Sequence, residues 1–211
     1  MITLLHPSRG RPEKAYNTYK LWLSRAKEKN IEYILGIDED DKHKSKYIEL
    51  FKKEGKNAKV FIGNNNSLVE CTNKIARLSN GDILIYLSDD FECPVYWDVQ
   101  ILRATKDHAK FLLKVDDCVQ SFHQTVLTIP IMSRTLYSEL GYFWFPEYKS
   151  MFCDVDLYYS TKKYHIYAPE LRFRHDHWLQ HGKVDETYKR SESNWKQGQK
   201  VWEKRQKENK W

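Results

Sequence analysis

Apolar and polar residues alternate in blocks from residue 2 to residue 92, and these blocks predict strands and helices in turn. We expect strands at four apolar runs of suitable length: Ile2–Leu5, Tyr33–Ile37, Lys59–Ile62 and Ile83–Leu87. Apolar residues at helical spacing predict helices from Pro12 to about Ala26, around Tyr47 to Phe51, and from Ser67 to about Leu78. Strands that alternate with helices favour parallel pairing and right-handed crossovers, so we predict a doubly wound α/β unit.

After Phe91 the pattern is less regular and predicts a second half of mixed structure. We expect three further strands and one helix, at Phe111–Val115, Thr125–Ile129, His165–Ala168 and near Ser133–Leu140. A chain of 211 residues is long enough for one domain with a core of its own. We therefore predict a single domain over residues 1–182, made of halves 1–92 and 93–182, and a C-terminal helical tail over 183–211.

The tail is basic, and two interpretations of it are open. It has nine Lys or Arg and five Asp or Glu, which is +4 of the formal net charge of +6. Cations together with Trp195, Trp202 and Trp211 would suit an anionic acceptor such as nucleic acid. We favour the alternative, in which a terminal helix docks its tryptophans on the domain and exposes its lysines to solvent.

The four cysteines are widely spaced and form no Cys-x-x-Cys pair, so neither a zinc knuckle nor a disulfide framework is expected. The sequence also lacks a run of about 18 apolar residues and a leader-like start. We expect a soluble, cytoplasmic protein with reduced thiols and no transmembrane segment.

Two adjacent carboxylates, Asp89 and Asp90, come just after the apolar run Ile83–Leu87. A strand buried on both faces cannot also bury a charge pair, so the pair belongs at the carboxyl edge of the sheet, where open α/β sheets bind ligands. Carboxylates there suit a hard cation, Mn²⁺ or Mg²⁺, that holds a phosphate. The alternative is a solvated turn. We expect Asp90 to bind the metal directly and Asp89 to face the sugar or ribose.

Two more polar segments follow predicted strands at the same edge. The loop His6–Arg11 offers two arginines, a serine and the start of a helix, which suit a diphosphate. Asp38 could accept hydrogen bonds from a base or a ribose. Each segment alone could be ordinary surface. In a parallel sheet they would converge with Asp89 and Asp90 on one crevice, which is the arrangement that a nucleotide diphosphate with a metal requires.

Motifs in three parts of the chain occur together in a known family. They are Leu5–Pro12, Gly81–Asp90, and Gly141–Phe143 followed by Cys153–Leu157. In order and spacing they resemble the GT-A glycosyltransferases of the family 2 type, over about residues 2–180. The resemblance implies a GT-A fold with a mostly parallel, Rossmann-like sheet flanked by helices. It also implies that half 1–92 binds a nucleotide-diphosphate sugar and that half 93–182 forms the acceptor side.

The resemblance further implies roles for single residues. Asp90, the last residue of the DXD-like motif, would hold the metal, and Asp154 would be the catalytic base that takes the proton of the acceptor hydroxyl. Local capping by Asp154 is the alternative. Ser88 stands where the family has the first Asp of its motif, and Cys153 replaces a common Glu. The expected contacts to the nucleotide sugar are Pro7, Ser8, Arg9, Arg11, Asp38, Asn73, Ser88 and Asp89.

Histidines at 175 and 177 end a possible strand, and alternation would put both on one face. Family 2-like enzymes often have a histidine near this place. Neutral imidazole can complete a metal site, so we expect His175 to be the second metal ligand, although two exposed histidines are the alternative.

The leading hypothesis is a metal-dependent, inverting hexosyltransferase that uses a UDP- or GDP-sugar. The acceptor stays open between a glycan, a protein and a modified nucleic acid. A nucleotidyltransferase is a rival, although the loop His6–Arg11 has a single glycine where that class has a glycine-rich phosphate loop. A second rival is a sugar-binding or nucleic-acid-binding module without catalytic activity.

Overall fold

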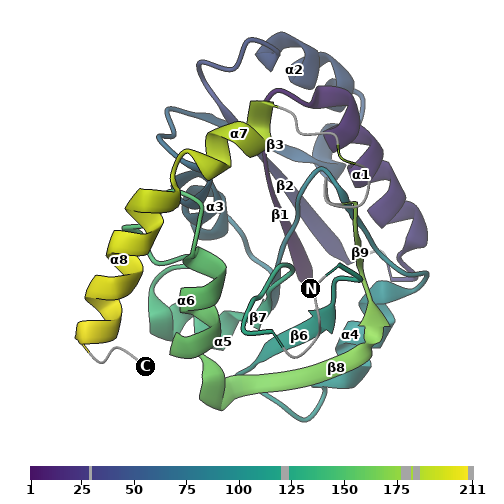
Figure 1. Ribbon diagram of the computed structural model, residues 1–211. Helices are drawn as coiled ribbons and strands as arrows, with labels where there is room; N and C mark the ends of the chain where they lie inside the picture. The colour runs from purple at the N-terminus through teal and green to yellow at the C-terminus, as the bar shows by residue number, and fades with distance from the viewer. Residues whose placement is uncertain (29, 120–123, 177–181, 183–185, 209–211) are drawn as a thin grey trace.

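The computed structural model describes residues 1–211 except 29, 120–123, 177–181, 183–185 and 209–211. Its centre is a seven-stranded sheet in the order β3-β2-β1-β4-β7-β6-β8 (Figure 1). The strands are β1 Ile2–Ser8, β2 Ile31–Asp38, β3 Lys59–Gly63, β4 Ile83–Tyr86, β6 Leu112–Asp116, β7 Ile131–Ser133 and β8 His165–Arg172. A separate antiparallel pair consists of β5 Phe91–Glu92 and β9 Arg174–His175.

The α-helices are α1 Pro12–Arg25, α2 Lys44–Lys52, α3 Leu68–Arg77, α4 Trp97–Thr105, α5 Arg134–Leu140, α6 Cys153–Ser160, α7 Glu186–Glu192 and α8 Trp195–Lys207. Short 3-10 helices cover Gly55–Asn57 and Lys162–Tyr164. None of the helices in the described part of the chain is both long enough and apolar enough to span a membrane.

The first half confirms the predicted alternation of strand and helix. Strands β3, β2, β1 and β4 are parallel, and Figure 1 shows α1 and α3 on opposite sides of them. Strands β1 and β4 are buried along their whole length, as continuous apolar runs predict. Ser67 caps α3, because its Oγ accepts a hydrogen bond from the backbone N–H of Glu70 over 3.1 Å. Asp89 and Asp90 therefore lie just beyond the carboxyl end of β4.

The second half departs from the prediction at one strand. Residues 125–129 form no strand; the strand is β7, which follows Pro130 and runs antiparallel to both β4 and β6. Leu127 and Ile129 are buried, at 2% and 3% exposure, within irregular backbone. These residues are apolar because they are buried, although they do not pair with a strand. The predicted strands near 111 and 165 and the helix near 133 are present as β6, β8 and α5.

The C-terminal tail is helical, as predicted, and packs on the body of the protein. Figure 1 shows α7 and α8 in yellow along one side of the molecule. The Trp202 ring lies 5.4 Å from the ring of Tyr159, and the Trp195 ring lies 4.9 Å from that of Phe152. These contacts agree with the docked interpretation of the tail. Trp211 lies outside the described residues.

Candidate active site

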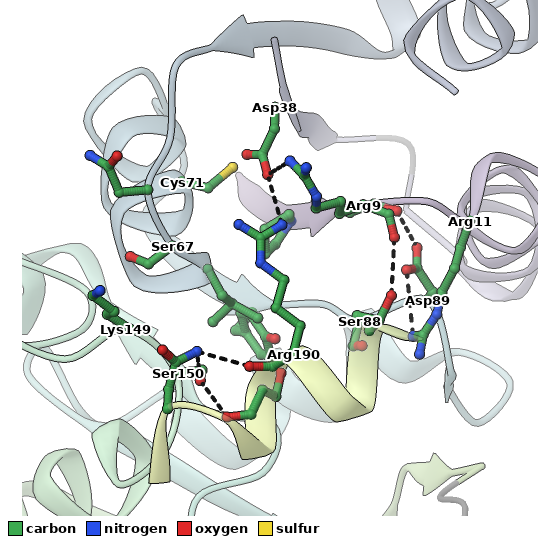
Figure 2. Close-up of a pocket in the computed structure, with 18 residues that line it drawn as sticks. Arg9, Arg11, Asp38, Ser67, Cys71, Ser88, Asp89, Lys149, Ser150 and Arg190 are labelled. Atoms are coloured by element: carbon green, nitrogen blue, oxygen red, sulfur yellow. Dashed lines mark hydrogen bonds and ion pairs between the residues drawn. The ribbon is translucent and has the colours of Figure 1, made fainter. Parts of the chain in front are cut away.

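Loops after β1, β2 and β4 and the helix α7 border a cavity, which we call the arginine cavity (Figure 2). Its lining includes seven of the predicted donor contacts: Pro7, Ser8, Arg9, Arg11, Asp38, Ser88 and Asp89. The other lining residues include Ser67, Cys71, Tyr86, Lys149, Ser150 and Arg190. The predicted convergence of three strand ends on one crevice is therefore present in the structure.

An ion-pair network joins the first loop to the end of β2. The Arg9 guanidinium lies 2.5 Å from Asp38 Oδ2 and 2.6 Å from Asp40 Oδ1. The hydrogen bond to Asp40 raises the pKa of Arg9 more than partial burial lowers it, so the guanidinium stays charged. Asp38 Oδ1 accepts a further hydrogen bond from Asn65 over 3.0 Å. The loop turns at Gly10, whose φ of +72° favours glycine.

Asp89 stabilises this loop through hydrogen bonds. Its Oδ1 accepts hydrogen bonds from Ser8 Oγ at 2.7 Å and from the His6 ring at 3.0 Å, and the side chain is buried. The second nitrogen of His6 lies 2.6 Å from the hydroxyl of Tyr33. We expected Asp89 to face a sugar or ribose. The structure places it on the cavity wall with one oxygen already bonded to the loop.

A second cavity adjoins the first, and we call it the carboxylate cavity because Asp90 and Asp154 both line it. Ser88, Tyr86 and Arg11 line both cavities. The walls of the carboxylate cavity also include Phe91, Leu127, Thr128, Trp144, Phe152, His175 and Tyr188. The structure thus brings the expected metal ligand, the expected base and His175 together. His177 lies outside the described residues.

Asp90 is held by groups from three parts of the chain. Its Oδ2 accepts a hydrogen bond of 2.6 Å from the Tyr188 hydroxyl and lies 3.6 Å from His175 Nε2. Burial alone would raise the pKa of Asp90, but interactions with His175, Tyr188 and Ser88 outweigh it and hold the pKa well below its usual range. The other oxygen, Oδ1, is buried and has no hydrogen-bond partner among the described residues.

These groups suit a divalent cation that is shared with a substrate. The buried Asp90 Oδ1 is an oxygen ligand without a hydrogen-bond partner among the described residues, and His175 Nε2 lies 3.6 Å from Oδ2 of the same carboxylate. Within the described ranges, no three His, Cys, Asp or Glu side chains form a complete metal site. Mg²⁺-like ions are commonly held by one or two carboxylates together with substrate phosphates, so the ligands present fit such an ion.

Asp154 stands in the first turn of α6 on the far wall of the carboxylate cavity. Its Oδ1 accepts a hydrogen bond from the backbone N–H of Val155 over 2.9 Å, and burial raises its pKa. Phe152, just before the helix, has a φ of +70°, a strained conformation for a bulky residue. Cys153 is buried, its thiol donates to the Ser150 carbonyl, and burial raises the pKa of the thiol.

One predicted donor contact, Asn73, is not among the residues that line either cavity. Asn73 is buried in α3, where its Nδ2 donates to the Trp144 carbonyl at 2.7 Å and its Oδ1 accepts from the backbone N–H groups of Phe143 and Trp144. These three bonds use both acceptor positions of the Asn73 oxygen and one of its two N–H donors. Asn73 therefore holds the aromatic segment 143–144 against α3, and we do not retain it as a sugar contact.

Sequence reasoning missed the residues that α7 contributes. Tyr188 reaches Asp90, and Arg190 lies 4.0 Å from Asp38, with its side chain extending into the arginine cavity in Figure 2. The tail showed only its basic charge, and no local pattern placed it over the strand ends. Lys149 was missed for a similar reason, since a lone lysine in an irregular loop gives no signal of a site.

No protein-family model and no curated protein matches the chain, but solved structures do. A crystal structure of S. aureus TarS 1-349 matches with a TM-score of 0.66 at 11% identity, over 82% of this chain and 60% of that one. TarS 1-349 in complex with UDP-GlcNAc matches with a TM-score of 0.63 at 12% identity, over 89% and 63%. The mannosyltransferase PcManGT from Pyrobaculum calidifontis, in complex with GDP-Man and Mn²⁺, matches with a TM-score of 0.66 at 10% identity. This match covers 82% of this chain and 56% of that one.

The chain thus spans roughly three fifths of the length of these structures. At such low identity the likeness concerns the arrangement of strands and helices alone. The protein has a GT-A-like glycosyltransferase fold.

Proposed function

We propose that the protein is a glycosyltransferase that moves a sugar from a nucleotide diphosphate to an acceptor hydroxyl. The observation that carries the proposal is the pairing of Asp90 and Asp154 across one cavity that opens into the arginine cavity. The structural neighbours include proteins solved with UDP-GlcNAc and with GDP-Man and Mn²⁺, which supports a nucleotide sugar as the donor. We propose UDP- or GDP-hexoses as the first donors to test.

In this proposal the nucleotide lies in the arginine cavity and the sugar extends into the carboxylate cavity. Arg9, Arg11 and the α7 residue Arg190 supply positive charge where a diphosphate would lie. Asp90 and His175 would hold Mn²⁺ or Mg²⁺, which supplies charge that stabilises the departing diphosphate.

Asp154 acts as the general base. An acceptor hydroxyl that enters the carboxylate cavity loses its proton to the Asp154 carboxylate as its oxygen attacks the anomeric carbon. A single base suits a single displacement, so we propose inversion at that carbon. Phe91, Trp144 and Phe152 give the carboxylate cavity an apolar part of its wall, against which the acceptor could pack.

The acceptor remains a glycan, a protein or a modified nucleic acid in this proposal. The four cysteines are free thiols, which agrees with a reducing compartment, and we propose the cytoplasm.

A donor panel tests the proposal. We would incubate the protein with UDP-glucose, UDP-GlcNAc, GDP-mannose and free nucleoside triphosphates, each with and without Mn²⁺, and measure thermal stabilisation and slow hydrolysis. A glycosyltransferase should show both effects with one sugar nucleotide, and both should depend on the metal. A preference for triphosphates would favour a nucleotidyltransferase. Binding of a sugar nucleotide without any turnover would favour a non-catalytic module.

The raised pKa of Asp154 predicts a distinct pH profile. The base must be ionised to work, so kcat/KM should fall as the pH drops through the pKa of Asp154. Because burial raises that pKa above its ordinary 3.8, the acid limb should lie above the range of an exposed aspartate. Asp90, whose pKa is lowered, stays ionised through that window. A profile that is flat down to pH 4 would contradict this role for Asp154.

A further inference from the structure

The helix α7 places a tyrosine hydroxyl directly on the proposed metal ligand. Tyr188 Oη lies 2.6 Å from Asp90 Oδ2, and the Arg11 guanidinium lies 5.2 Å from the centre of the Tyr188 ring. The next contact along the helix joins Thr187 Oγ1 to the Arg9 carbonyl at 3.3 Å. The tail thus contacts both the first loop and the end of β4, the two elements around the proposed diphosphate and metal.

Helix α8, which follows α7 along the chain, is attached to the part of the protein that carries Asp154. Helix α8 packs on the segment just before α6, the helix that carries Asp154, so closely that a Cβ on Gly198 would lie 2.4 Å from the Met151 carbonyl oxygen. Arg205 forms a buried ion pair with Asp156 of the same helix α6. Figure 1 shows α7 and α8 as a continuous run along this side of the molecule. The C-terminal segment therefore connects the element that holds Asp154 to the carboxylate of Asp90.

The two carboxylate oxygens of Asp90 have different surroundings. Oδ2 has Tyr188 and His175 beside it, whereas the buried Oδ1 has no hydrogen-bond partner in the described part of the chain. The terminal torsion of an aspartate is soft, with a broad distribution of angles. A hydrogen bond at Oδ2 removes that freedom and leaves Oδ1 in a fixed direction.

We propose that Tyr188 is a positioning residue for Asp90, whose hydroxyl orients the carboxylate so that Oδ1 can bind a divalent cation. The inference rests on the metal-dependent function proposed above and adds to it a residue from the tail. Groups that orient metal ligands commonly change metal affinity by about 10- to 100-fold when they are removed.

The test is Mn²⁺ binding to the full-length Tyr188→Phe variant. Phenylalanine keeps the ring over Arg11 and removes only the hydroxyl. Free Mn²⁺ is measured by electron paramagnetic resonance, with the protein alone, with UDP and with GDP. We expect Mn²⁺ to bind about 10- to 100-fold more weakly to the variant than to the wild type, with a changed spectrum for the bound ion.

Gln197→Met is the matched control, because it removes a hydrogen bond of 2.7 Å that docks the tail on the Glu147 carbonyl, outside both cavities, but keeps the hydroxyl on Asp90. Its Mn²⁺ affinity and spectrum should stay close to wild type. Equal losses in both variants would mean that only the docking of the tail matters and would overturn the inference. Unchanged or tighter Mn²⁺ binding in Tyr188→Phe would overturn it too. A wild-type protein that binds no Mn²⁺ under any condition would instead overturn the metal site, and the inference with it.

Discussion

Asp154→Asn should lower the turnover of sugar transfer by about two to four orders of magnitude while the nucleotide sugar still binds. The amide keeps the shape of the side chain and can still accept from the backbone N–H of Val155, but it cannot take a proton from the acceptor. The arginine cavity does not include Asp154, so the contacts to the nucleotide should survive. Turnover is measured with the donor identified in the panel, and donor affinity by calorimetry.

Asp107→Asn serves as the matched control, since Asp107 is a largely exposed aspartate whose side chain is 79% accessible. It should behave like the wild type in both measurements. Turnover of Asp154→Asn within a few fold of wild type would remove Asp154 from the mechanism. A loss of donor binding in parallel with turnover would show that Asp154 belongs to the binding site and not to the proton transfer.

The first half of the fold could be predicted because its signals are local. Strand β4 reads as an unbroken apolar run because both of its faces are covered, and the carboxylates after it mark where burial ends. Ser67 and Glu70 mark the start of α3 through a cap that involves only neighbouring residues. The second half lacks such signals. Leu127 and Ile129 are as apolar as strand residues, but they fill the core from an irregular loop.

Only the site residues that lie at the ends of strands could be predicted from the sequence. Asp38 ends β2 and Asp90 comes soon after β4, and the parallel order of these strands places both residues at one edge, so their convergence follows from topology. Tyr188 lies 98 residues from Asp90 along the chain, and no spacing in the sequence indicates that contact. Asn73 shows the opposite case: the sequence does not reveal that its side chain bonds to the backbone of Phe143 and Trp144.

Arg205→Met should destabilise the protein by about 3–5 kcal/mol, the usual cost of leaving one buried charge without its partner. Arg205 Nε lies 2.5 Å from Asp156 Oδ1, its second contact reaches Oδ2 at 3.2 Å, and Asp156 is only 1% exposed. The guanidinium also lies 3.7 Å from the ring centre of Phe145, a contact that methionine would only partly replace. Urea denaturation of the wild type and of Arg205→Met, monitored by tryptophan fluorescence, gives the difference in their free energies of unfolding.

Two comparisons separate the buried charge from ordinary loss of packing. Lys204 lies on α8 like Arg205 and forms an exposed ion pair with Glu147. Lys204→Met removes this pair and should lower the free energy of unfolding by at most about 1 kcal/mol. The double variant Arg205→Met with Asp156→Asn should recover part of the loss, because the unpaired charge is then gone. If Arg205→Met costs no more than Lys204→Met, the ion pair does not anchor α8 to α6. The tail would then have to be held over Asp90 mainly by the apolar contacts of Val201 and Trp202, and Tyr188 would owe its position to them.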